Sequence, residues 1–284
     1  MLRQLTILGP GLLGGSIGLA ARHVKAAERI VIWARRPEAV DQAWKLGAAD
    51  EATENLEKAV AEAELVVLAT PIGAMQALAE KMKPSLPDGC VVTDVGSVKY
   101  PVVSALTHAL SGKARFVGSH PMAGSEQSGI DAARRDLFQD AVCIVTPRKD
   151  TDPVALRLVF DFWKTLGCSV ATLTPEMHDA IVAQVSHLPH LVAAALVNVV
   201  CAGGSKPLNF VGPGFKDVTR VASGTTEMWT EICLENRDEI GRAVDALLDE
   251  LGKMRAALKN ADAVELRAML KQAKHFRDEL RFRT

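Results

Sequence analysis

The sequence lacks the cysteine patterns that mark disulfide-rich or zinc-binding proteins. Its five cysteines are scattered, none forms a C-x-x-C pair, and their number is odd. A disulfide framework and a cysteine zinc site are therefore not expected. Isolated cysteines of this kind usually pack as small hydrophobic residues. We predict that the protein has no metal site.

Long apolar runs and an excess of charge of one sign are also missing. Glycine and proline interrupt the N-terminal apolar run at Gly9, which argues against a signal peptide. No run reaches the roughly 20 apolar residues that are needed to cross a membrane. The net charge of -1 gives no overall attraction to nucleic acid or to a lipid surface. We predict a cytoplasmic protein that binds neither.

What the first half of the chain does contain is an alternation of short apolar runs and helical patterns. The candidate strands begin near Leu5, Ile30, Leu65, Cys90, Val142 and Cys168. This alternation predicts a parallel sheet with helices on both faces. After Thr172 the strand pattern stops, and helical patterns cover about 174–202, 227–258 and 262–281. We place a domain boundary there, with residues 1–172 before it and residues 173–284 after it.

A glycine-rich turn joins the first candidate strand to the first candidate helix. Its sequence, Gly9-Pro10-Gly11-Leu12-Leu13-Gly14, has the G-x-G-x-x-G spacing of dinucleotide-binding folds. The glycines allow a tight turn, a close approach of a pyrophosphate and close helix–strand packing, and the helix N-terminus attracts the phosphates. A tight turn without a ligand is the alternative. In this strand–turn–helix context we predict a Rossmann-type domain over 1–172.

The end of the second candidate strand bears on the choice of cofactor. NAD-binding domains usually carry an acidic residue there for the ribose 2′-OH, but this chain has Arg35 and Arg36 instead. A guanidinium pairs well with a 2′-phosphate, which favours NADP over NAD. The alternative is that both arginines are solvated surface charges. The nearest acid, Glu38, already lies in the next helix.

Polar segments that follow later strands carry the candidate chemistry. Asp94 to Lys99 follows the strand near Cys90, and the loop from Gly118 to Glu126 is expected to follow a further strand. Ligands in such sheets bind beyond the carboxyl ends of the strands. His120 is the candidate acid–base residue, because oxidising an alcohol removes a hydride and a proton. Ser97 is a candidate for orienting that imidazole or the nicotinamide.

The helical half contributes a second polar set. Pro189 within a long helical pattern indicates a kink, and His187 and His190 flank it on one helix face. Metal binding by the two histidines is disfavoured, because no carboxylate or cysteine lies near them in sequence. Further along, Arg220 and Lys216 are candidates for clamping a substrate carboxylate, unless they are simply exposed charges near a helix.

The other histidines, and two of the tryptophans, are predicted from their sequence neighbours. His23, His108, His178 and His275 are interpreted as surface residues or helix ends. Trp229 is expected near a site, whereas Trp163 is expected in the core.

Taken together, these motifs resemble the prephenate dehydrogenases and their arogenate and cyclohexadienyl relatives. The resemblance spans nearly the whole chain and rests on GPGLLGGSIGLA at 9–20, ATPI at 69–72 with Thr70 and Pro71, DVGSVK at 94–99, GSHPMAGSE at 118–126, SHLPH at 186–190 and GFKDVTR at 214–220. The set in this order is more specific than any single motif. The departure from it is the missing acid after the second strand.

The resemblance implies oxidative decarboxylation of prephenate to 4-hydroxyphenylpyruvate, or of arogenate to tyrosine, with NAD or NADP as hydride acceptor. It implies that His120 polarises the ring C4 hydroxyl, that Ser97 supports it, and that Arg220 binds a carboxylate of the dianionic substrate. It further implies a substrate pocket lined by His187, His190, Glu126 and Trp229.

The resemblance also implies that the helical domain, residues 173–284, pairs two subunits into a homodimer. The apolar run 191–197 fits such an interface. A chorismate mutase domain and a regulatory ACT domain, which some relatives carry, are not expected in this chain. Two other functions stay open: a 3-hydroxyacid dehydrogenase of the same two-domain plan, and a dinucleotide sensor without catalysis.

Overall fold

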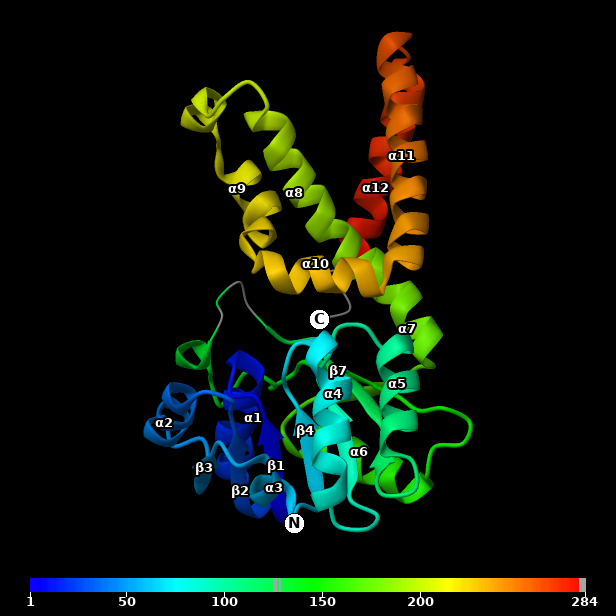
Figure 1. Ribbon diagram of the computed structural model, residues 1–284. Helices are drawn as coiled ribbons and strands as arrows, with labels where there is room; N and C mark the ends of the chain where they lie inside the picture. The colour runs from blue at the N-terminus through cyan, green and yellow to red at the C-terminus, as the bar shows by residue number, and fades with distance from the viewer. Residues whose placement is uncertain (125–126, 128, 281–284) are drawn as a thin grey trace. The chain divides into compact units, whose positions relative to one another are not determined.

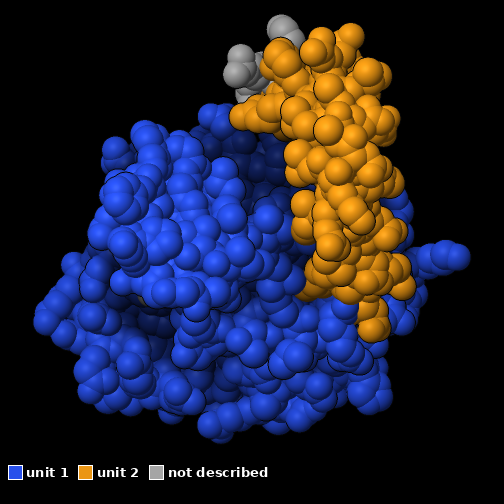
Figure 2. All heavy atoms as spheres, turned by 90° about the horizontal axis from the view of Figure 1, so that it is seen from above, with its two compact units in different colours: residues 1–237 blue, residues 238–284 orange. Residues whose placement is uncertain are grey.

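The computed structural model describes residues 1–124, 127 and 129–280. The chain divides into two compact units, residues 1–237 and residues 238–284, which Figure 2 colours separately. The second unit consists of two helical stretches: most of α11 (Arg237–Lys259), and α12 (Ala263–Glu279). Everything said below about the candidate site concerns the first unit.

A parallel sheet forms the centre of the first unit. Its strands are β1 (Leu2–Leu8), β2 (Ala27–Trp33), β3 (Glu51–Thr53), β4 (Leu65–Leu68), β5 (Val91–Asp94) and β6 (Arg115–Phe116). Their spatial order is β3-β2-β1-β4-β5-β6, and all neighbours are parallel (Figure 1). This is the strand order of the Rossmann fold, in which the direction of winding reverses between β1 and β4. The predicted fold class is confirmed.

Apolar strand residues are buried on both faces of this sheet. Leu65 and Val67 belong to one hydrophobic cluster, whereas Val66 and Leu68 belong to another. Successive strand residues face opposite sides, so burial of both faces produces the uninterrupted apolar runs seen in the sequence. The accompanying helices are α1 (Leu12–His23), α2 (Pro37–Lys45), α3 (Leu56–Val60), α4 (Ile72–Met82), α5 (Tyr100–Leu110) and α6 (Pro153–Thr165).

A second, three-stranded sheet carries the candidate acid–base residue. It contains β7 (Gly118–Pro121), β8 (Val142–Thr146) and β9 (Ser169–Thr172), with β7 antiparallel to β8 and β8 parallel to β9. His120 therefore lies in a short strand opposite Ile144, not in the loop that its glycine and proline neighbours suggested. Gly118 serves close packing, because a Cβ there would lie 2.5 Å from the Thr146 Oγ1 atom.

The helical segment expected over 174–202 contains an irregular turn. It consists of α7 (Pro175–Val182), a π-helical turn (Ala183–His187) and α8 (Leu188–Cys201). Pro189 has no N–H to give to the carbonyl of Val185, four residues earlier, and the π turn lies at this point. After α8 come α9 (Pro213–Thr219) and α10 (Thr226–Glu235).

The expectation that no segment is long and apolar enough to cross a membrane is wrong. Among the described residues, the continuous segment Pro175–Cys201 reaches 27 residues with a mean hydropathy of 1.6. The search for unbroken apolar runs missed it because polar side chains are spaced along it. Only 28% of its most apolar window is buried. A core helix of a soluble protein can satisfy the same criteria, so the finding concerns length and composition only.

Candidate functional site

The glycine turn lies where β1 ends and α1 begins, at the point where the sheet reverses. Gly9 has a φ of +106°, and a Cβ on Gly14 would lie only 2.0 Å from the Gly9 carbonyl oxygen. Both positions therefore require glycine for the turn itself. Gly11 differs, because a Cβ there would meet nothing within 4 Å. The backbone is therefore tightly packed at Gly14, whereas the space next to Gly11 is free of protein atoms.

Unpartnered polar groups surround this opening. Gly11 is the N-cap of α1 and no side chain caps that helix, while Leu12 and Leu13 of its first turn are half-buried. Thr70 follows β4, with Pro71 after it, and its hydroxyl is buried without a hydrogen-bond partner among the described residues. A helix N-terminus and a buried hydroxyl without a partner suit a phosphate-bearing ligand. The residues present thus fit the pyrophosphate of a dinucleotide.

Arg35 and Arg36 follow β2 at the same edge of the sheet. Both are exposed, and Arg36 is the N-cap residue of α2. The structure gives neither an ion pair within its described part. Glu38 lies in the first turn of α2, as expected, and is exposed as well.

His120 is the buried centre of a hydrogen-bonded chain of side chains. Its side chain is 7% exposed, and its Nδ1 lies 2.8 Å from the Nε2 of His178. The Nδ1 of His178 lies 2.7 Å from the Oδ1 of Asp179, and both residues come from α7. Burial, together with electrostatic repulsion between His120 and its neighbours His178 and Lys99, lowers the pKa of His120 well below its ordinary value of 6.5. His120 is therefore a neutral imidazole at physiological pH.

Asp179 is fixed by the backbone at the start of α5. Its two carboxylate oxygens accept hydrogen bonds from the backbone N–H of Lys99, at 2.7 Å, and of Tyr100, at 2.8 Å. These contacts join α7 to α5, which lie next to each other (Figure 1). The helix α7 is thereby anchored to the start of α5.

A fully buried ion pair lies under His120. The Lys99 ammonium donates to Asp94 and, at 2.9 Å, to the Ser119 carbonyl, and neither charged side chain is exposed. The Ser119 hydroxyl also donates to the Asp94 carbonyl oxygen at 2.6 Å. Buried charges require such complete pairing, because an uncompensated one is expensive. The pair fixes β7 to the end of β5.

The interpretation of His178 as a surface residue is wrong, since the side chain is fully buried. His23, His108 and His275 are exposed, as predicted. Ser97 is half-buried and makes no hydrogen bond with His120 in the described structure. The Nδ1 atom of His120 is hydrogen-bonded to His178 instead. The sequence signal for His178 was weak: an adjacent His and Asp in a short helix that also contains Glu176.

His187 and His190 lie on either side of the π turn's end and contact Trp229. The His190 ring stacks on Trp229 at 3.5 Å, and His187 meets it edge-on at 6.1 Å. Burial lowers the pKa of His187 to about 4, and burial also lowers the pKa of His190. One ring nitrogen of each is buried without a hydrogen-bond partner among the described residues. Gly224 admits the indole, since a Cβ there would lie 2.5 Å from the Trp229 Nε1.

The remaining predicted residues make no described contact with His120. Arg220 follows α9 and is exposed, and the backbone carbonyl of the next residue, Val221, accepts a hydrogen bond from the His190 imidazole. Lys216 is exposed on α9 itself. Glu126 lies outside the described residues. Trp163 is fully buried, as predicted, and donates to the Ser119 hydroxyl at 2.9 Å.

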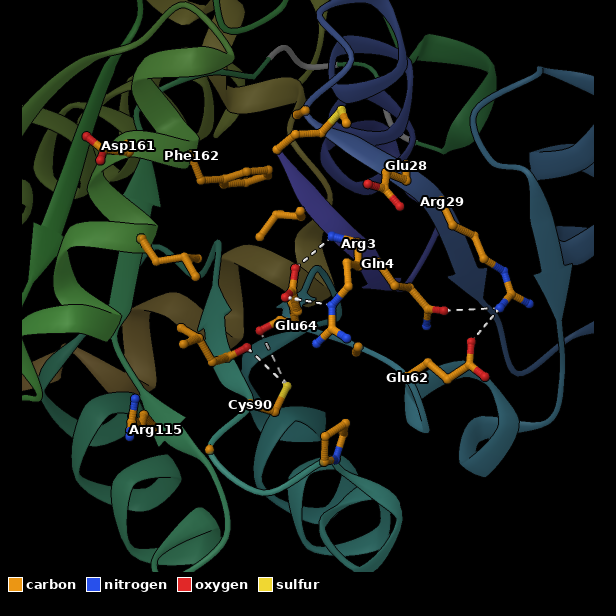
Figure 3. Close-up of a pocket in the computed structure, with 18 of the residues that line it drawn as sticks. Arg3, Gln4, Glu28, Arg29, Glu62, Glu64, Cys90, Arg115, Asp161 and Phe162 are labelled. Atoms are coloured by element: carbon orange, nitrogen blue, oxygen red, sulfur yellow. Dashed lines mark hydrogen bonds and ion pairs between the residues drawn. The ribbon is translucent and has the colours of Figure 1, made fainter.

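A cavity of about 1220 Å³ lies at the opposite edge of the sheet, where the strands begin (Figure 3). Charged side chains lining it pair with each other: Arg3 with Glu64 at 3.0 Å and Arg29 with Glu62 at 2.9 Å. None of the predicted site residues lines this cavity. We therefore look for the functional site at the carboxyl edge, where the predicted residues lie, and not in this cavity.

Comparison with known proteins gives matches over nearly the whole chain. Residues 17–172 match the family "Prephenate dehydrogenase, nucleotide-binding domain", and residues 174–272 match "Prephenate dehydrogenase, dimerization domain". The prephenate dehydrogenase of Bacillus subtilis is 36% identical over 98% of this chain and 76% of its own length.

Two solved structures are also similar. The prephenate dehydrogenase of Aquifex aeolicus, in complex with hydroxyphenyl propionate and NAD+, is 33% identical with a TM-score of 0.92 and covers 99% of both chains. The arogenate dehydrogenase of Synechocystis is 30% identical with a TM-score of 0.84, over 98% of this chain and 99% of its own.

Proposed function

This chain belongs to the prephenate dehydrogenase family, and we propose that it converts prephenate to 4-hydroxyphenylpyruvate and carbon dioxide in tyrosine biosynthesis. A nicotinamide dinucleotide, NAD or NADP, is the hydride acceptor. The observation that carries the proposal is His120, a buried neutral imidazole at the edge of the sheet where the glycine turn also lies.

His120 acts as the base in this reaction. The hydride leaves ring C4, the imidazole takes the proton of the C4 hydroxyl, and carbon dioxide leaves C1 as the ring becomes aromatic. The proton returns to the phenol oxygen, so no net proton is consumed by the residue. No electron sink other than the developing C4 carbonyl is needed, because the departing carboxylate's electrons flow into the ring.

Residues of the helical half bind the substrate in this proposal. Arg220 pairs with a substrate carboxylate, because a guanidinium forms two parallel hydrogen bonds to such a group. The side chains of His187, His190 and Trp229, already in mutual contact, form a wall of the pocket. Lys216 and Glu126 complete the predicted set, and Ser97 is assigned to the nicotinamide.

Substitution of His120 tests this function. In His120→Asn the rate constant kcat with prephenate should fall by at least ~10²-fold, the usual contribution of a general base. His108→Asn, which changes an exposed histidine of α5, is the control and should leave kcat unchanged. Unchanged turnover in His120→Asn would contradict the mechanism. Activity on simple 3-hydroxyacids but not on prephenate would favour the other enzyme class.

Arogenate is the second candidate substrate, because a 30% identical relative is an arogenate dehydrogenase. The two substrates differ in a keto or an amino group on the side chain. Comparing kcat/KM for prephenate and arogenate in one assay series decides between them. We favour prephenate, the substrate in the name of the 36% identical relative.

NADP is the proposed cofactor of the two dinucleotides. The support is the pair of exposed arginines after β2, without an acid at the strand end. The double variant Arg35→Ala, Arg36→Ala should raise the KM for NADP at least ~10-fold and change the KM for NAD by less than about twofold, since only NADP carries the 2′-phosphate. A wild-type enzyme that strongly prefers NAD would contradict this.

We further propose that residues 1–172 bind the dinucleotide and residues 173–284 form the substrate and dimerisation domain. The support is the family match, which changes at residues 172 to 174, and the name of its second part. The cytoplasmic location and the lack of nucleic-acid and membrane partners stay predictions.

A further inference from the structure

The described structure contains a hydrogen-bonded chain that ends on the proposed base. It runs from the Asp179 carboxylate through the two ring nitrogens of His178 to Nδ1 of His120, with separations of 2.7 and 2.8 Å. We propose that His178 and Asp179 are positioning residues that hold His120 with its proton on Nδ1 and its lone pair on Nε2. This inference rests on the proposed function, because a base must present a lone pair to its substrate.

The donors and acceptors along this series of hydrogen bonds can be assigned from Asp179, whose partners on the backbone are fixed. The backbone N–H groups of Lys99 and Tyr100 can only donate, so both oxygens of Asp179 act as acceptors. Oδ1 therefore also accepts from His178, whose proton lies on Nδ1. In a neutral imidazole the other nitrogen carries the lone pair, so the Nε2 of His178 accepts a hydrogen bond from the Nδ1–H of His120. Nε2 is the nitrogen of His120 that remains.

Burial, assisted by the Lys99 charge, keeps both rings neutral. Burial lowers the pKa of His178, although its bond to Asp179 acts in the opposite direction. The buried Lys99 ammonium and the neighbouring His187 oppose a positive charge on His120, whereas Asp94 is already paired with Lys99. An imidazolium at either position is thus disfavoured, and the chain has one consistent arrangement of protons.

The arrangement also serves the step in which the base takes a proton. His120 then becomes positively charged, and its Nδ1–H continues to donate to His178. Asp179 lies one ring further and its negative charge stabilises the new cation, as a buried carboxylate does behind a catalytic histidine in other enzymes. Without His178, the Nδ1 of His120 would have no acceptor in the described structure, and either tautomer could form.

Ring-nitrogen NMR tests the proton assignment directly. In wild-type protein labelled with ¹⁵N-histidine at pH 7.5, the spectrum should show His120 protonated at Nδ1 and unprotonated at Nε2, with the signal identified by its loss in His120→Asn. The opposite tautomer, or a doubly protonated ring, would overturn the proposal. This measurement needs no substrate, so it stands even if the protein does not oxidise prephenate.

Kinetics of two variants at His178 provide the second test. His178→Leu removes the acceptor and should lower kcat for prephenate about 10²-fold while KM changes less than about threefold. His178→Gln offers an amide oxygen near the position of Nε2 and should retain activity within about tenfold of wild type. His108→Leu, at an exposed position, is the matched control. Equal losses in the Gln and Leu variants, or a loss in KM alone, would contradict a positioning role.

Discussion

Gly11 and Gly14 belong to the same turn, but their surroundings predict different consequences of substitution. In Gly14→Ala the new methyl would collide with the Gly9 carbonyl, so the free energy of unfolding should fall by ~1–3 kcal/mol or more. In Gly11→Ala the methyl meets open space, and the stability should change by less than about 1 kcal/mol.

Dinucleotide affinity is the second property to measure, because Gly11→Ala should lose affinity without losing stability. The opening above Gly11 is where we place the pyrophosphate, so Gly11→Ala should weaken NAD(P) binding by about tenfold or more while the protein stays folded. Urea unfolding and a cofactor titration followed by fluorescence measure the two effects. A Gly11→Ala protein that binds the dinucleotide as tightly as wild type would contradict the placement.

Individual site residues could be predicted from the sequence where a short motif around them indicates their role. The glycine turn and His120 stand in short motifs whose residue types follow from chemistry at the end of a strand. His178 was missed because its partner, His120, is 58 positions away and the helix around it gives no polar pattern. A hydrogen bond between distant elements becomes visible only when the chain is folded.

At the level of elements, two helices that begin at the carboxyl edge of the sheet have N-termini capped by acids from the helical half. Glu231 of α10 accepts hydrogen bonds from the backbone N–H of Ile72, at 3.1 Å, and of Gly73, in the first turn of α4. Asp179 does the same for α5. A carboxylate is favourable there, because the first N–H groups lack partners and the helix dipole is positive. These contacts join the sheet to α7 and α10.

The cap on α4 can be tested by substitution. Glu231→Ala should lower the free energy of unfolding by about 1–2 kcal/mol, the usual range for losing a helix cap. Glu231→Gln retains one acceptor oxygen and should lose less. Glu235→Ala, at the exposed C-terminal end of the same helix, is the control and should unfold like wild type. Urea midpoints that are equal for the variants at position 231 and the control would contradict the capping role.

The elements themselves were predicted best where the pattern was long or the run was clearly apolar. The strands β1, β2, β4 and β5 and the helices after Thr172 lie close to their expected positions. The strands β3 and β6 have only three and two residues, and β7, although as long as β4 and β5, has the sequence GSHP, which is not an apolar run. The antiparallel pairing of β7 with β8 was not predicted either, because strand direction depends on contacts that no local pattern contains.

The whole molecule, as a single chain, leaves an apolar helix uncovered, and we expect a second copy to cover it. Within α8 the buried residues are His190 and Ala193, while Val199 is 73% exposed. The family match names this region a dimerization domain. We predict a homodimer of twice the 30.4 kDa chain mass. Sedimentation equilibrium measures it, and a wild-type monomer at micromolar concentration would contradict it.

A charge in this helix should weaken the dimer. Val199→Asp places an unpaired carboxylate in the proposed interface, which costs several kcal/mol and should raise the dissociation constant at least ~10²-fold. Val154→Asp introduces the same change at a comparably exposed valine of α6 and should leave the dimer intact. If both variants sediment alike, α8 is not the interface.

The stability of the whole protein should depend on pH through its buried histidines. Burial lowers the pKa of His120, His178, His187 and His190, and that of His187 falls from 6.5 to about 4. The unfolded chain therefore binds more protons than the folded one in this range, and stability is full above pH 6.5 and falls as the pH approaches 4. His187 alone should account for about 3 kcal/mol of the total loss of stability on acidification, at 1.36 kcal/mol per unit of pKa shift.

Urea unfolding at pH 7.5, 6.5, 5.5 and 5.0 should show this decrease. Surface carboxylates such as Glu51 and Glu64 have pKa values that ion pairs and hydrogen bonds to Lys58, Arg29 and Arg3 lower, so their contribution to stability is lost only at more acidic pH. The window from pH 6.5 to 5.0 therefore isolates the histidines. In His187→Asn the decrease across this window should be smaller, because one of the four groups no longer titrates. An unfolding free energy that stays constant from pH 6.5 to 5.0 would mean that these rings are not held neutral in the folded protein.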